Sequence, residues 1–102
     1  MSAPTTVIEP VTEIDEKTRL GPRWKVILLN DDVTTFQFVT ELLQSLFHKQ
    51  HAEAVRLTRE IHESGSALIT VTSLERAELY VQQVRSLARP RGFPLTATME
   101  PA

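Results

Sequence analysis

The chain has 102 residues, a formal charge of -2 and 41% hydrophobic residues, so it supports one domain with one modest core. The acidic balance argues against a surface that binds nucleic acid. The absence of cysteine excludes disulfides and thiolate metal sites. No apolar run approaches the length that spans a membrane.

The N-terminal part of the chain differs in composition from the rest. It lacks the basic start and apolar stretch of a secretory signal, and the acidic residues between Glu9 and Glu16 are ones that a transit peptide avoids. We therefore expect a cytoplasmic protein. Prolines, threonines and acids leave little apolar surface to bury before Gly21-Pro22. Residues 1–22 are thus expected to form a disordered extension, and residues 23–102 the folded domain.

The first predicted element is a strand over residues 24–29, because its apolar run from Val26 onward is typical of a buried strand. An amide and two carboxylates follow it directly, in Asn30-Asp31-Asp32. Thr34 and Gln37 then have the spacing of a helix-capping box. A helix is expected over residues 35–49, with one apolar face made of Phe36, Val39, Leu43, Leu46 and Phe47.

Periodicity and punctuation predict the remaining elements. A helix is expected over 52–64, with Ala54, Leu57 and Ile61 inward and Gly65 as its C-terminal stop, followed by a strand over 67–72. The next helix is capped by Ser73 and ended by Pro90, and its apolar residues at helical spacing are Ala77, Val81, Val84 and Ala88. The last predicted element is a strand over 95–99. The order β-α-α-β-α-β indicates an α+β fold, an α/β sandwich in which a three-stranded antiparallel sheet packs on three helices.

Several of these pieces together resemble the ClpS family. The resemblance is carried by Trp24 to Asp32, Thr34, Phe38-Val39, Ile61-His62, Gly65 and Pro94 to Glu100. It covers the chain from about Trp24 to the C-terminus. Members of this family are adaptors that deliver N-degron substrates to the Clp protease. The resemblance implies a domain that is also found at the C-terminus of a ribosomal stalk protein, in agreement with the element order above.

The resemblance also implies a binding site for a free α-amino group and the bulky side chain beside it. An ammonium has three donors and a positive charge, so it needs converging acceptors and negative charge. The implied α-amino-binding residues are Asn30, Asp31, Asp32 and His62, and which of the two Asp residues meets the amino group stays open. The implied apolar pocket consists of Leu28, Leu29, Thr34, Phe36, Val39, Thr58, Ile61 and Leu95.

The implied partners are N-degron chains that begin with Leu, Phe, Tyr or Trp, and a Clp AAA+ ATPase of the ClpA or ClpC type. Many members of the family have an acid at the position of Glu75 that meets the ATPase, and often Lys at that of Tyr80; these two residues are the expected ATPase-facing pair. In the family the N-terminal extension engages the ATPase during delivery. The family commonly has Met where this chain has Phe36 and Thr58, so the preferred N-terminal residue stays open.

Two other classes of function are compatible with part of the sequence. Two carboxylates and a His could serve a metal-dependent enzyme, through Asp31, Asp32 and His62. The chain nevertheless lacks a second acidic motif and a Gly-rich phosphate loop. A ribosome-associated or other protein-binding module is suggested by the shared fold alone. We expect no catalytic residue, metal, cofactor, nucleic acid or membrane partner, and a monomeric chain.

Overall fold

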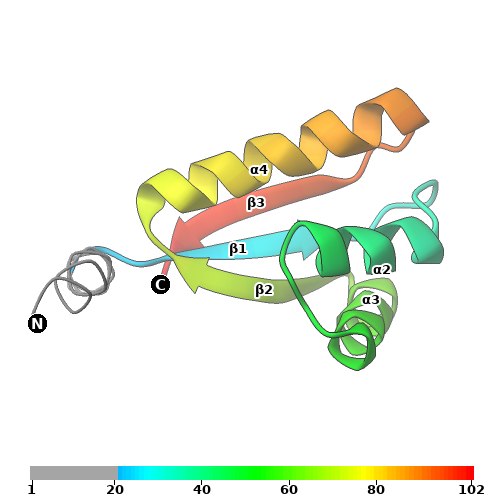
Figure 1. Cartoon of the computed structure of the whole chain (residues 1–102), viewed down its shortest axis with the longest axis horizontal. Coiled ribbons are helices and arrows are strands. Elements are labelled where there is room, and N and C mark those ends of the chain that lie inside the picture. The colour runs from blue at the N-terminus through cyan, green and yellow to red at the C-terminus, as the bar shows by residue number, and fades with distance from the viewer. Residues whose placement is uncertain (1–20) are drawn as a thin grey trace, which may run out of the picture.

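The computed structural model describes residues 21–102, which form a three-stranded sheet and three α-helices (Figure 1). The elements are β1 (Trp24–Leu29), α2 (Phe36–Ser45), α3 (His51–Ser64), β2 (Ser66–Thr72), α4 (Leu74–Ala88), the 3-10 turn η1 (Arg89–Arg91) and β3 (Thr96–Pro101). The predicted element order and fold class are confirmed. The predicted extension, residues 1–22, lies outside the described residues apart from its last two.

β1 is the central strand of the sheet, whose order is β2-β1-β3 with both pairings antiparallel. Leu28 lies opposite Ala67 and Ala97, and all three are buried. Their neighbour Leu29 is half-buried, because successive side chains of a strand point to opposite faces. Figure 1 shows α4 running along β3, and α2 and α3 gathered where β1 ends. The polar turn after β1 therefore opens next to both of these helices.

The pairing of β1 with β2 contains an irregularity. Val26 pairs with Thr70, whereas the next residue, Ile27, pairs with Leu68. Ile69 is therefore an extra residue in β2, a β-bulge. Because of this bulge, Leu68 and Val71 lie opposite Ile27 and Lys25 on the uncovered face of the sheet, while Ile69 is buried.

The first helix begins and ends differently from the prediction. Its N-cap is Thr35, whose hydroxyl accepts a 3.1 Å hydrogen bond from the Phe38 N–H, so the capping box expected at Thr34 is wrong. The Thr34 hydroxyl instead donates to Asp31. The helix stops at Ser45 rather than near residue 49, since the chain adopts a left-handed backbone at His48 with φ of 59°.

The other predicted helix boundaries are confirmed closely. Gly65 ends α3 with φ of 93°, a conformation that a residue with a side chain rarely adopts. Its N–H donates to the Ile61 carbonyl. Ser73 caps α4 by accepting from the Arg76 N–H at 3.3 Å. These two short-range signals fix both ends of β2, and hence the position of α3 relative to the sheet.

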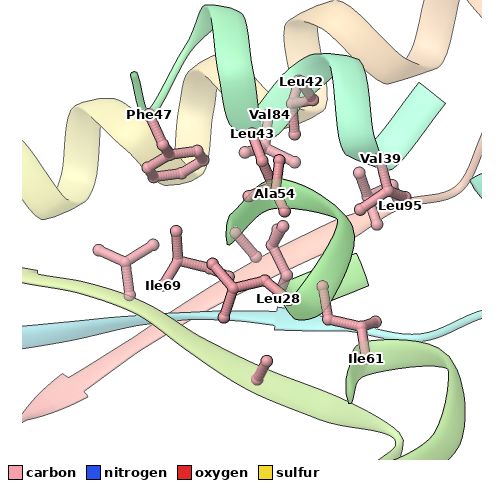
Figure 2. Close-up of a cluster of buried hydrophobic side chains, with 14 of the residues drawn as sticks. Leu28, Val39, Leu42, Leu43, Phe47, Ala54, Ile61, Ile69, Val84 and Leu95 are labelled. Atoms are coloured by element: carbon pink, nitrogen blue, oxygen red, sulfur yellow. The ribbon is translucent and has the colours of Figure 1, made fainter. Parts of the chain in front are cut away.

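The core lies between the sheet and the helices (Figure 2). Its largest fully buried side chains are Leu28, Leu43, Leu95, Val26 and Val84. Burying each of these stabilises the fold by roughly 1.5–3 kcal/mol relative to leaving it exposed. β1, the three α-helices and the loop before β3 thus contribute to one core. This core holds the residues around the end of β1 in place.

Candidate functional site

The turn after β1 is built around the carboxylate of Asp31. Its Oδ1 accepts from the N–H groups of Val33 at 2.8 Å and Thr34 at 2.7 Å, and its Oδ2 accepts from the Thr34 hydroxyl at 2.7 Å. Burial disfavours the charged carboxylate, but the hydrogen bonds from Thr34 and Val33 and the charge of Arg89 outweigh it and lower the pKa of Asp31. Asp31 is therefore a charged residue that shapes its own loop.

Asp32 has a different setting. It is exposed, and within residues 21–102 no hydrogen bond to its side chain occurs. The carboxylate of Asp32 is thus free to meet a ligand, whereas that of Asp31 already serves three donors.

The backbone joins the polar turn to the end of α3. The N–H of Asn30 donates to the carbonyl of Gly65 at 2.8 Å, directly after the last turn of α3 that carries His62. The side chains of Asn30 and His62 are both exposed. An amide and an imidazole from distant parts of the sequence thereby line the same hollow.

This hollow has a volume of about 300 Å³. Its polar rim and its walls come from the β1–α2 turn, the start of α2 and the second half of α3. The lining residues are Asn30, Asp31, Asp32, Thr34, Thr35, Phe36, Val39, Thr58, Ile61 and His62. All of them except Thr35 were expected at the site, so the structure brings together the whole predicted rim and most of the predicted walls.

Three residues predicted as pocket walls do not line the hollow. Leu28 and Leu95 are 0% and 1% exposed, because both are covered by the helices and belong to the core. Leu29 points to the other face of the sheet, where it lies opposite Ser66 and Thr96. Thr35, which sequence reasoning missed, reaches the hollow as the N-cap of α2; its position directly before the apolar helix face was the available signal.

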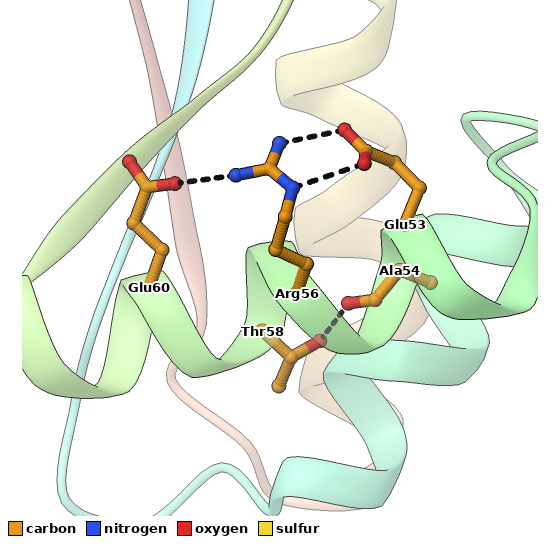
Figure 3. Close-up of polar contacts among 5 residues, drawn as sticks. All are labelled: Glu53, Ala54, Arg56, Thr58 and Glu60. Carbon is orange, nitrogen blue, oxygen red and sulfur yellow. Dashed lines mark hydrogen bonds and ion pairs between the residues drawn. The ribbon is translucent and has the colours of Figure 1, made fainter.

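The deep wall of the hollow contains a pair of buried hydroxyls. Thr58 donates to the carbonyl of Ala54 at 2.7 Å, as Figure 3 shows, and the Thr40 hydroxyl lies 3.0 Å from the Thr58 hydroxyl. Both threonines are buried. Arg56, on the exposed side of α3, pairs instead with Glu53 and Glu60. The polar atoms of Thr58 are thus satisfied inside the protein, and the hollow gains a short wall.

A second hollow of about 520 Å³ lies at the other end of α2. It is lined by Ser45, Leu46, His48, Ser73, Glu75, Arg76, Leu79, Tyr80 and Gln83. The structure therefore brings the predicted ATPase-facing pair, Glu75 and Tyr80, into one concave surface. Tyr80 packs on Phe47 with ring centroids 4.5 Å apart. The two hollows share no lining residue, so they are separate concave surfaces.

A metal-binding cluster and a membrane-spanning helix are both absent from the part of the chain that the structure describes. Within it, no three His, Asp or Glu side chains are placed to hold a metal ion, so Asp31, Asp32 and His62 do not make a ligand set. Among the helices of residues 21–102, none has the length and apolarity needed to cross a bilayer.

Comparison with known proteins agrees with this geometry. The family model of the ATP-dependent Clp protease adaptor protein ClpS matches residues 19–98. A ClpS adapter protein of Nautilia profundicola is 42% identical over 90 residues, covering 88% of this chain and 93% of that protein. A ClpS adapter protein of Acetivibrio thermocellus is 40% identical over 97 residues, covering 94% of this chain and 95% of that protein.

A solved structure is similar as well. Agrobacterium tumefaciens ClpS2 bound to L-phenylalaninamide has a TM-score of 0.77 and 36% sequence identity, covering 79% of this chain and 98% of that chain. The family match, the relatives and the shared fold all span the domain that carries the hollow. The chain belongs to the ClpS family of Clp protease adaptors.

Proposed function

We propose that the hollow at the end of β1 binds the free α-amino group and first side chain of N-degron substrates, which the chain delivers to a Clp AAA+ ATPase. The observation that carries this proposal is the meeting of a polar, acidic rim with apolar walls in one hollow of about 300 Å³. The ligand of the similar ClpS2, L-phenylalaninamide, has the matching parts, an amino group beside an aromatic side chain.

The rim suits an ammonium group. The Asn30 amide oxygen and a neutral imidazole nitrogen of His62 are acceptors, and the two Asp carboxylates supply acceptors and negative charge. Each charge-assisted hydrogen bond contributes about 1.5–3 kcal/mol before binding entropy is subtracted. An acetylated terminus loses the charge and two of the donors, which gives selectivity for true chain ends.

The walls suit one large apolar side chain. Val39 and Ile61 are buried, and Phe36, which is 45% exposed, also lines the hollow. Filling the hollow with a Leu or Phe side chain contributes roughly 1.5–3 kcal/mol. Together with the rim, this supports an affinity on the order of micromolar for a peptide end.

Delivery requires a second surface, and the hollow around Glu75 and Tyr80 is the candidate for contact with the ATPase. Its separation from the first hollow lets the adaptor hold substrate and ATPase together. On this proposal the protein is an adaptor without catalysis of its own, it works in the cytoplasm as a monomer, and residues 1–22 act during delivery.

The test is a titration with peptides that differ only in whether the N-terminal amine is free or acetylated. The wild type should bind the free form, and Asn30→Ala or His62→Ala should weaken this binding about tenfold or more, because each leaves an ammonium donor unpaired. His51→Ala is the matched control, since His51 is an exposed His outside the hollow. Equal affinity for free and acetylated peptides would refute the proposal.

A further inference from the structure

Phe36 presents an unpaired aromatic ring at the mouth of the hollow. It is the first residue of α2 and 45% exposed. The other described phenylalanines pack on aromatic partners: Phe38 on Phe93 at 5.0 Å and Phe47 on Tyr80 at 4.5 Å. In residues 21–102, Phe36 has no such partner. Its ring is thus available to a ligand.

Thr58 forms a short and immobile wall at the deep side of the same hollow. It is 3% exposed, and its hydroxyl donates to the Ala54 carbonyl. A β-branched side chain has few rotamers, and this hydrogen bond fixes the one that is occupied. The hydroxyl is therefore hydrogen-bonded within α3. Because Thr is short, the hollow keeps space for a ligand that a longer side chain would fill.

The hydroxyl of Thr40 links these two features. It lies 3.0 Å from the Thr58 hydroxyl and 3.0 Å from the Phe36 carbonyl, and its single proton goes to one of them at a time. Thr40 thereby links the Thr58 wall on α3 to the backbone at the start of α2, from which the Phe36 side chain projects. The Thr58 side of the hollow is therefore held by hydrogen bonds within the protein.

We infer that Phe36 and Thr58 together select an aromatic N-terminal residue over leucine, Phe36 as a stacking face and Thr58 as the wall that leaves depth for a ring. This inference rests on the proposed function and names the substrate class of the same hollow. Aromatic pairs are favoured beyond the burial of their area by an increment that corresponds to about two- to twelvefold in affinity.

The experiment compares two free-amine peptides that differ only in beginning with Phe or Leu. The wild type should bind the Phe peptide more tightly. Phe36→Leu should lower the Phe-to-Leu affinity ratio about two- to twelvefold. Thr58→Met, which fills the deep side with a longer chain, should weaken the Phe peptide more than the Leu peptide. Thr98→Met makes the same exchange on the exposed face of β3 and should keep the wild-type ratio.

A wild-type ratio at or below one, or a ratio that stays unchanged in both Phe36→Leu and Thr58→Met, overturns the inference. If Thr58→Met does not fold, the ratio in Phe36→Leu decides, because Phe36 is exposed and outside the core. Loss of the difference between free and acetylated peptides in the wild type marks failure of the proposed function. Intact amine dependence with an unchanged ratio overturns the aromatic preference alone.

Discussion

Asp31 and Asp32 are adjacent and carry the same charge, yet the structure gives them different tasks. Asp31 accepts three hydrogen bonds within its own turn, whereas the exposed Asp32 accepts none within residues 21–102. Replacing each by Asn removes one negative charge from the rim in both cases. Asp31→Asn and Asp32→Asn should therefore have similar effects on electrostatic attraction to a free amine, but different effects on folding.

The expected loss of stability follows from the hydrogen bonds. An Asn at position 31 still offers one acceptor oxygen to the backbone N–H groups, but its NH₂ group cannot accept the proton of the Thr34 hydroxyl. The remaining bonds weaken from charge-assisted to neutral, from about 1.5–3 to about 0.5–1.5 kcal/mol each. Since the turn is partly exposed to water, we expect a total loss of about 1–2 kcal/mol for Asp31→Asn. Asp32→Asn should stay within about 0.5 kcal/mol of wild type.

Thermal unfolding followed by circular dichroism measures this difference. For a domain of this size, about 1–2 kcal/mol corresponds to a fall in Tm of about 4–16 °C. Titration with a free-amine peptide, in the same buffer, reports the loss of charge from the rim for both variants. Equal Tm values for the two variants, or a wild-type Tm for Asp31→Asn, would refute the reasoning that Asp31 organises the turn.

Three further predictions concern pH, delivery and the N-terminal segment. Folding lowers the pKa of Asp31 from its ordinary value of 3.8, so the stabilisation of the fold by the Asp31 carboxylate is present above that pH and is lost as pH falls through the folded pKa. The urea midpoints of wild type and Asp31→Asn should therefore converge in acid. Glu75→Lys should leave peptide affinity within about twofold, or roughly 0.4 kcal/mol, while it slows degradation of a degron-bearing protein by the Clp protease; an unchanged rate excludes Glu75 from ATPase contact. Deleting Met1 to Leu20 should likewise spare peptide affinity but abolish delivery, and a parallel loss of affinity would place that segment at the pocket.

The fold could be predicted where the chain carries local signals. The bounds of β1 are confirmed because an apolar run ends abruptly at Asn30, and Gly65 and Ser73 are residues whose chemistry specifies a helix end. His48 gives no such signal, although its left-handed backbone shortens α2. The bulge at Ile69 depends on pairing between distant strands, which local periodicity does not encode.

The site was predictable in its rim and less so in its walls. Polar residues directly after a buried strand stand out, and Asn30 and the two acids do line the hollow. Pocket walls and core use the same apolar residue types, so nothing local separates Val39, which lines the hollow, from Leu28, which does not. Only the three-dimensional packing of α2 and α3 makes that distinction.

The bulge in β2 affects how this edge of the sheet can pair with other chains. β2 is an edge strand, and Leu68 is 46% exposed on it. A flat edge strand with exposed apolar side chains is a template for extended chains and a starting point for aggregation. The extra residue Ile69 interrupts the regular ladder and increases the local twist. The bulge thus limits the length over which a foreign strand could pair with β2 in register.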